Sequence, residues 1–358
     1  MQNNQINNNS LYQATVNKAD NLLRTNTEWI RRYNDYINDL ECRIKPLVNA
    51  ATLRFGTAKN LDIYLPLSLA KKATQSSASF DIRVGGQSVA TLIVKNSDVC
   101  ISFNTKNNVN YFKDYSNYPF HKRVSAKTKH GMLGCIQDGI LSWHSPEAVA
   151  FRKYFAQCQV GKLRSLEHNY ESQLLKQFSM KTSKGKILKN IQPVKLLGKR
   201  FQMPTPIQAN QSGKKVINYA NANGGGIDIL ARYGSGRRTS LTVFELKDEC
   251  VKKERPEEAI SQAIAYATFI RQLLRSSNAN TDKWWRFFGF GRPLTNSGLG
   301  IKAVIAMPVG KYNDTSFAGI KLPLQTIGPY NNDHIELHYL YFNINSSNEI
   351  TGISSTSL

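Results

Sequence analysis

The segment between residues 226 and 248 constrains the fold of this chain more than any other segment. It consists of two apolar runs, "GIDILARYG" (226–234) and "SLTVFELKD" (240–248), on either side of a short turn that contains Gly236. Short runs rich in β-branched and aromatic residues and bounded by turn residues are typical of β-strands. Two such strands joined by a glycine-containing turn predict an antiparallel hairpin.

Both predicted strands carry charged residues inside their apolar runs: Asp228 in the first, Glu245 and Lys247 in the second. Burying a charge costs free energy unless the charge has a partner or a function. If the turn is centred on residues 236 and 237, Asp228 lies opposite Glu245, and the two side chains share one face of the sheet. Gly226 then lies opposite Lys247 and leaves room for its amine. A slip of one residue would separate these groups, and the sequence leaves that alternative open.

This arrangement of charges suits one kind of chemistry. Two carboxylates that close repel each other, and one keeps a proton unless a cation lies between them. A hard divalent ion such as Mg²⁺ prefers oxygen ligands, polarises a phosphoryl oxygen and acidifies bound water. An adjacent lysine can orient that water and stabilise the charge that develops on the phosphate. Asp228, Glu245 and Lys247 therefore predict metal-assisted hydrolysis of a phosphodiester.

The elements around the hairpin follow a definite order. Periodicity and turn signals predict a helix over 166–178, a strand over 193–203, the hairpin, a helix over 255–277, and strands over 301–310 and 334–344. Pro256 fits the first turn of its helix, where the missing N–H is not needed. The order predicts an α/β fold in which helices flank a mixed sheet.

Asp228 followed by Glu245-Leu246-Lys247 resembles the signature of the PD-(D/E)XK nuclease superfamily. The order helix, three strands, helix, strand is similar to the core of that superfamily. Gln262 and Tyr266, four residues apart on one helix face, resemble the Q-x-x-x-Y motif of its RecB-type branches. The resemblance covers roughly residues 160–310 and departs where Ile227 replaces the proline of the motif.

The resemblance implies a restriction-endonuclease-like core and the activity of a Mg²⁺- or Mn²⁺-dependent endodeoxyribonuclease. Asp228, Glu245 and the carbonyl of Leu246 would hold the metal ion. Lys247 would orient the attacking water.

Three more residues are implied to assist at this site. Gln262 and Tyr266 would brace it or touch the phosphate. Glu171, on the helix before the sheet, matches the position where many members of the superfamily have a further acidic residue, and it would add a metal-bound water.

The charge of the chain also points to nucleic acid. The formal net charge is +22, with 47 Lys and Arg against 25 Asp and Glu, which favours a polyanionic partner. Residues 161–215 carry twelve Lys and Arg against Glu167 and Glu171 only. We expect nucleic acid as the partner, with DNA favoured, an anionic membrane as the weaker reading, and a homo-oligomer left open.

The cysteines and the apolar runs address the compartment. Five widely spaced cysteines without a C-x-x-C pair argue against a disulfide framework or a zinc site. The N-terminal residues show no signal-peptide pattern, and no run approaches the roughly 18 apolar residues of a membrane span. We expect a cytoplasmic protein that has no membrane partner.

The chain divides into three predicted parts. Residues 1–10 are polar and Asn-rich, which predicts a disordered tail. Residues 11–150 combine a helical pattern with a three-strand meander over 79–103, which predicts an α+β domain for recognition or regulation. Residues 151–358 form the predicted nuclease domain.

One aromatic segment and the biological role leave alternatives open. "KWWRFFGFGRP" (283–293) either caps the core or offers a stacking surface for unpaired bases. The chain could be a catalytically silent nucleic-acid-binding protein on the same fold, or a nuclease effector gated by its N-terminal domain. Restriction, antiviral defence and repair all fit the chemistry.

Overall fold

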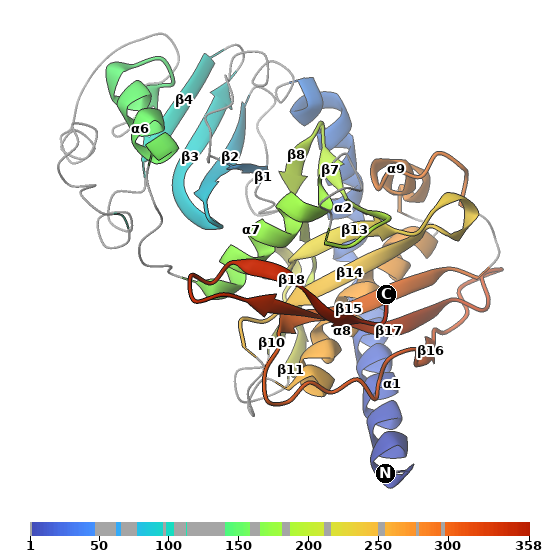
Figure 1. The fold of residues 1–358 in the computed structure, drawn as a ribbon. Coiled ribbons are helices and arrows are strands. Elements are labelled where there is room, and N and C mark those ends of the chain that lie inside the picture. Colours follow the sequence, from blue (N-terminus) through green and yellow to red (C-terminus); the bar gives the residue numbers. More distant parts are fainter. Residues whose placement is uncertain are drawn as a thin grey trace.

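The computed structural model describes residues 2–46, 62–65, 77–95, 98–103, 112, 140–157, 165–180, 187–210, 216–249, 255–276, 279–294 and 298–358. Within these ranges the chain is a mixed α/β protein in which two large sheets are flanked by helices (Figure 1). The helices are α1 (Gln2–Thr25), α2 (Glu28–Asp39), α6 (Pro146–Gln157), α7 (Leu166–Phe178), α8 (Pro256–Arg275) and α9 (Thr281–Phe287). None of these described helices is long and apolar enough to cross a membrane.

The strands belong to two large sheets and two small ones. The first large sheet contains β1 (Asp62–Leu65), β2 (Ser77–Val84), β3 (Gln87–Lys95), β4 (Asp98–Phe103), β5 (Ile140–Ser142), β7 (Lys195–Leu196) and β8 (Lys199–Phe201). The second contains β6 (Ile191–Pro193), β13 (Ile229–Tyr233), β14 (Ser240–Leu246), β15 (Gly300–Pro308), β16 (Lys321–Pro323), β17 (His334–Ile344) and β18 (Ile350–Thr356). The small sheets pair β9 (Met203–Pro204) with β12 (Gly226–Ile227) and β10 (Ile207–Asn210) with β11 (Val216–Tyr219).

The second sheet is mixed and carries the predicted hairpin. Its strand order is β16-β17-β15-β14-β13-β6, with β14, β15 and β17 parallel and the other pairs antiparallel. Strands β14 and β15 are buried along nearly their whole length, as is usual for parallel strands covered on both faces. In the hairpin, Ile229 lies opposite Phe244 and Leu230 opposite Val243, so the predicted register is confirmed.

The predicted pairing of Gly226 with Lys247 is wrong. Gly226 lies in β12, opposite Pro204 of β9, and the N–H of Lys247 donates instead to the carbonyl of Ala306. The chain bends at Asp228, so the hairpin ladder begins only at Ile229. Residues before the bend therefore pair with a different strand.

The predicted strand over residues 193–203 is also wrong in its extent. The structure divides this segment among β6, β7, β8 and β9. Leu197 (φ 48°) and Gly198 (φ 78°) both have left-handed backbones, which reverse the chain between β7 and β8. As a result β6 joins the second sheet, whereas β7 and β8 join the first.

Helices cover both faces of the second sheet (Figure 1). One face packs against α8 in a core that includes Leu230, Val243 and Ile264. The opposite face packs against α7 in a second core that includes Phe244 and Leu174. The alternation of these side chains along β13 and β14 gives the sheet two apolar faces, which explains why it needs a helix on each side.

Helix α1 lies against α8 rather than in a tail (Figure 1). It begins at Gln2, so the predicted disorder of residues 1–10 is wrong. Its buried residues, such as Leu23, anchor the helix, and each added turn then costs little because only nucleation of a helix is unfavourable. The side chain of Gln272 in α8 donates a hydrogen bond to Asp20 in α1.

The first sheet contains the predicted meander of β2, β3 and β4, which are neighbouring antiparallel strands. Gly85 and Gly86 form its first turn with positive φ angles of 52° and 78°. The sheet continues through β1 into β8, a parallel pair. The division into residues 11–150 and 151–358 stays a prediction, and both this pair and the contact of α1 with α8 run across it.

The cysteines differ from the expectation at one described position. Cys42 is an exposed free thiol, whereas Cys100 in β4 is disulfide-bonded. Sequence spacing does not fix the distance between two cysteines in space, so it could not exclude this bond. Disulfides are rare in reducing compartments, and the cytoplasmic location therefore stays a prediction.

Candidate active site

The candidate site lies where β13 begins and β14 ends. These strands are antiparallel, so the first residues of one and the last residues of the other meet at the same edge of the sheet. Asp228 directly precedes β13, Glu245 and Leu246 close β14, and Lys247 follows. The N–H of Leu246 donates a hydrogen bond of 2.8 Å to the Oδ2 atom of Asp228, which fixes this carboxylate against the neighbouring strand.

Glu245 and Lys247 form a buried ion pair. The Nζ atom of Lys247 lies 2.8 Å from the Oε1 atom of Glu245, and the two residues are 7 % and 1 % exposed. Burial alone would lower the pKa of Lys247, but the carboxylates of Glu245, Glu167 and Asp228 outweigh it and raise the pKa above its ordinary value. The amine is therefore a permanent positive charge at neutral pH.

Asp228 lies in an environment with an excess of negative charge. Burial, followed by the carboxylates of Glu245, Glu167 and Glu171, raises the pKa of Asp228 well above its ordinary value, and Lys247 only partly opposes this shift. Such a site favours a bound proton or a bound cation. Glu167 was not among the sequence-predicted site residues, although its position one helical turn before Glu171 would have indicated it.

Glu171 is held at the start of α7. The Oγ atom of Ser165 caps this helix by accepting a 3.2 Å hydrogen bond from the N–H of His168. Glu171 is 2 % exposed; its Oε2 atom lies 3.3 Å from the Nδ1 atom of His168 and 3.7 Å from Nη1 of Arg83. Its Oε1 atom is buried and has no hydrogen-bond partner in the described part of the chain. A buried carboxylate oxygen without a donor is a place for a ligand or a water.

The β2–β3 hairpin of the first sheet also reaches this site. Gly86, at its tip, packs so closely on α7 that an added Cβ would lie 1.9 Å from the carbonyl oxygen of His168. The side chain of Gln87 donates a 3.0 Å hydrogen bond to the carbonyl of Ser165. Arg83 is oriented by a 2.6 Å contact of its Nε atom with Asp81. Sequence reasoning missed Arg83, because no local pattern links it to a helix more than eighty residues away.

Gln262 and Tyr266 lie on α8 at the edge of the site. The Nε2 atom of Gln262 lies 3.4 Å from the hydroxyl of Tyr266. That hydroxyl lies against the backbone that leads to Asp228, because a Cβ added to Gly225 would be 2.3 Å from it. Burial and the nearby carboxylate of Glu245 raise the pKa of Tyr266, so its hydroxyl stays protonated.

The structure thus brings the sequence-predicted residues to one edge of the sheet but does not form a closed metal site. Among the described residues, no three His, Cys, Asp or Glu side chains converge closely enough to hold a metal ion. Lys247 occupies one oxygen of Glu245, and the Leu246 N–H occupies one oxygen of Asp228. The structure records the N–H of Leu246 in a contact with the site, whereas the expected role of its carbonyl stays a prediction.

No protein-family model, curated protein sequence or solved structure matches this chain. The functional assignment therefore depends on the chemistry of these residues.

Proposed function

We propose that this chain is a Mg²⁺- or Mn²⁺-dependent nuclease of the PD-(D/E)XK type with a restriction-endonuclease-like core, and that it cuts DNA internally. The observation that supports the proposal most is the hairpin register, which places Asp228 beside Glu245 and Lys247. An ordinary structural ion network would balance its charges, whereas here the carboxylates outnumber the nearby lysine. The raised pKa of Asp228 reflects this excess.

The residues present fit a hard divalent cation. Asp228, Glu245 and the carbonyl of Leu246 are oxygen donors of the kind that Mg²⁺ prefers, and the free Oε1 atom of Glu171 can bind a metal-bound water. When bound, the ion would polarise the phosphoryl oxygen and lower the pKa of a water ligand.

The other side chains have roles that follow from their protonation. Lys247 stays charged, so it can orient a water and stabilise charge on the phosphate but cannot act as a base. Tyr266 keeps its proton and can donate a hydrogen bond, and Gln262 fixes the position of its hydroxyl.

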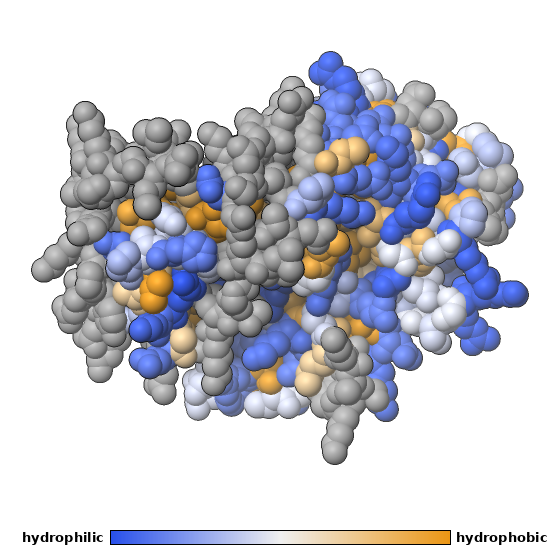
Figure 2. Space-filling view, turned by 90° about the horizontal axis from the view of Figure 1, so that it is seen from above, coloured by the Kyte–Doolittle hydropathy of each residue, from blue (hydrophilic) through white to orange (hydrophobic). Residues whose placement is uncertain are grey.

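The charge of the chain supports a nucleic-acid substrate. The formal net charge is +22, and hydrophilic residues gather over the surface seen in Figure 2, with small hydrophobic patches between them. In the basic segment, Lys189, Lys195 and Lys199 are described, whereas Lys184 and Lys186 lie outside the described residues. We expect log affinity for duplex DNA to fall against log salt with a slope of about −0.9 per phosphate contacted.

A cleavage assay tests the proposal. Single- and double-stranded DNA and RNA are incubated with the purified chain in Mg²⁺, Mn²⁺ or EDTA. We expect DNA to be cut with either metal ion and to stay intact in EDTA. Metal-dependent binding without cleavage of any substrate would instead identify a catalytically silent nucleic-acid-binding protein.

The contact between the β2–β3 hairpin and α7 favours a second candidate, a nuclease gated by its N-terminal sheet. Arg83 reaches Glu171 from that sheet, and Gly86 holds the hairpin against the helix that carries Glu167 and Glu171. A ligand or partner that pulled the hairpin away would therefore remove a positive charge from the metal site.

A further inference from the structure

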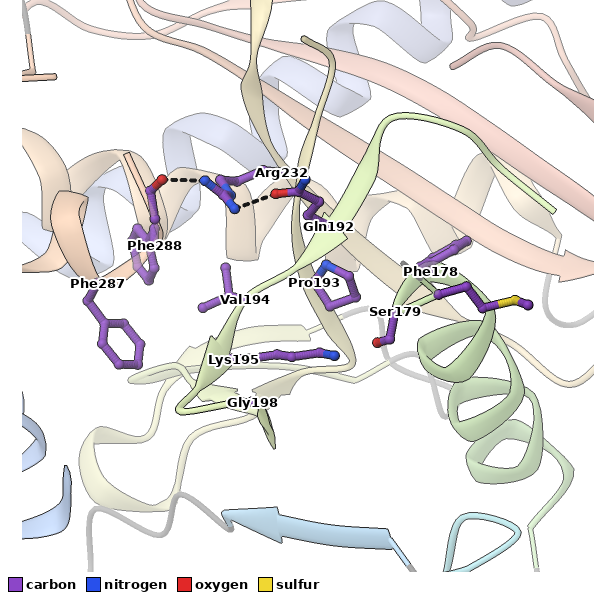
Figure 3. Close-up of a pocket in the computed structure, with 12 residues that line it drawn as sticks. Phe178, Ser179, Gln192, Pro193, Val194, Lys195, Gly198, Arg232, Phe287 and Phe288 are labelled. Atoms are coloured by element: carbon purple, nitrogen blue, oxygen red, sulfur yellow. Dashed lines mark hydrogen bonds between the residues drawn. The ribbon is translucent and has the colours of Figure 1, made fainter. Parts of the chain in front are cut away.

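A groove of about 400 Å³ lies between the end of α7, strands β6 and β7, and helix α9 (Figure 3). Its walls are mostly apolar and aromatic, and they carry two cationic side chains. The lining residues that matter below are Met180, Pro193, Lys195, Arg232 and Phe287. None of these residues belongs to the candidate active site.

The charged residues of the groove are both positive. Arg232 donates hydrogen bonds to the carbonyl of Gly289 and to the side chain of Gln192, which fix its guanidinium at the rim (Figure 3). Gly289 (φ 90°) permits this contact, since an added Cβ would lie 2.7 Å from the Arg232 guanidinium carbon. Lys195 extends along the opposite wall toward Ser179. The lining contains no Asp or Glu, so the groove suits an anionic ligand.

The apolar part of the groove is formed by side chains that are only partly buried. Phe287 packs edge-on against Phe201 with ring centroids 4.7 Å apart, but its own ring stays partly exposed. Met180 on the facing wall is 37 % exposed. A flat ring could insert between these walls, whereas a paired and stacked base could not enter such a groove. Base–aromatic stacking of this kind is worth about 1–3 kcal/mol per base.

The groove lies at a definite distance from the candidate active site, because two elements run from one to the other. Arg232 is four residues along β13 from Asp228, which is about 13 Å at a strand rise of about 3.3 Å per residue. Phe178 is seven residues along α7 from Glu171, which is about 10 Å at a helical rise of about 1.5 Å per residue. These distances correspond to three or four stacked nucleotides at about 3.4 Å each.

We propose that this groove binds an unpaired base of the nucleic-acid strand, about three or four nucleotides from the bond that is cut. The base inserts between Met180 and Phe287, and Lys195 contacts a backbone phosphate beside it. This inference rests on the proposed nuclease function for the identity of the ligand, and its test does not depend on cleavage. It makes single-stranded or unwound DNA, rather than intact duplex, the form that the chain grips most tightly.

Equilibrium binding tests the groove. In a Lys247→Ala background, which prevents cleavage, the probes are a fluorescein-labelled oligothymidine and a labelled blunt duplex. Met180→Trp fills the groove from an exposed position, and Leu11→Trp makes the same kind of change on α1, far from it. We expect Met180→Trp to weaken oligothymidine binding by about 5- to 150-fold, with unchanged duplex binding and no effect of Leu11→Trp.

A charge variant and a crosslink complete the test. Lys195→Gln should weaken oligothymidine binding more than duplex binding, whereas Lys189→Gln, an exposed lysine outside the lining, should weaken both equally. An oligothymidine that carries 5-iodouracil should crosslink to the peptide that contains Phe287. Equal losses on both probes, or a crosslink elsewhere, would overturn the groove assignment. Failure of the wild-type chain to cut DNA, with these binding results intact, would overturn the nuclease proposal alone.

Discussion

The N–H of Leu246 donates a 2.8 Å hydrogen bond to the carboxylate of Asp228, across the open end of the β13–β14 hairpin. This bond connects the residue that begins one strand to the last residue of the other. It determines where the Asp228 carboxylate lies relative to Glu245, and it leaves the second oxygen of Asp228 for a cation. The metal chemistry proposed above therefore depends on strand register as much as on residue identity.

Replacing either proposed metal-binding carboxylate should abolish cleavage without unfolding the protein. Asp228→Asn keeps an acceptor for the Leu246 N–H and removes a charge from a group of carboxylates that repel one another, so we expect equal or higher thermal stability. Single-turnover cleavage should fall by at least about 10²-fold, the lower range for losing one positioned catalytic group. Asp35→Asn, at an exposed position of α2, is the control. Full Mg²⁺-dependent cleavage by both Asp228→Asn and Glu245→Gln would disprove the site.

Lys247→Ala should separate catalysis from binding. If Lys247 acts mainly in the transition state, the single-turnover rate falls by about 10²–10⁴-fold while DNA binding in Ca²⁺ hardly changes. The unfolding free energy should also fall by up to about 3–5 kcal/mol in the metal-free protein, because the buried Glu245 loses its partner. Lys247→Arg should restore stability more than rate, since a planar guanidinium differs in shape from an ammonium. A variant that cuts normally but binds DNA weakly would show that Lys247 is a binding residue.

The raised pKa of Asp228 predicts a particular dependence of stability on pH. The folded state binds this proton more tightly than the unfolded state, in which the pKa is near 3.8. The stabilisation is therefore complete below about pH 4 and is lost as the pH rises through the higher pKa of the folded state. Denaturant unfolding of the metal-free protein should show this loss for wild type and not for Asp228→Asn. Saturating Mg²⁺ should remove it from wild type, and coinciding wild-type and variant profiles without metal would contradict the carboxylate repulsion.

Two glycines with the same backbone angle test the hairpin contact. Gly86 and Gly198 both have φ of 78°, but an added Cβ meets the carbonyl of His168 at 1.9 Å in the first case and nothing within 4 Å in the second. Gly198→Ala should cost about 1–2 kcal/mol for the left-handed backbone alone. Gly86→Ala should cost more and release the hairpin, which proteolysis between β2 and β3 would detect.

Release of the hairpin should also change metal binding. Arg83 lies 3.7 Å from Glu171, and removing a positive charge from an acidic site strengthens its attraction for a cation. We therefore expect both Gly86→Ala and Arg83→Ala to bind Mg²⁺ more tightly than wild type, measured by calorimetry. Unchanged Mg²⁺ affinity in both variants would remove the support for gating by the first sheet.

Local patterns predicted the parts of this fold that depend on local interactions. Helix α7 has its predicted bounds, α8 lies within the predicted 255–277, and the turn at Gly236 set the register that aligns Asp228 with Glu245. The errors arose where the chain changes sheets. The left-handed backbone at Leu197 divides a predicted strand, and the bend at Asp228 sends the preceding residues to another strand.

The parts of the site that could not be predicted come from distant segments. Arg83 reaches Glu171 only because the tip of a hairpin in one sheet lies on a helix that covers the other. Nothing in the spacing of either residue encodes that contact. The groove beside α9 likewise combines residues from three separate elements, and only the aromatic content of the segment over 283–293 indicated it.

The packing of α1 against α8 has a consequence for synthesis on the ribosome. Leu23 leaves the exit tunnel long before Phe269, and at about 5–20 residues per second the delay is about 12–50 s. During that time the aromatic side chains of α2, such as Trp29, lack the Phe269 ring that lies 5.7 Å away in the finished protein. The first helices to be made are thus among the last to be buried, and the nascent chain needs a chaperone or a temporary contact for its N-terminal end until α8 has emerged.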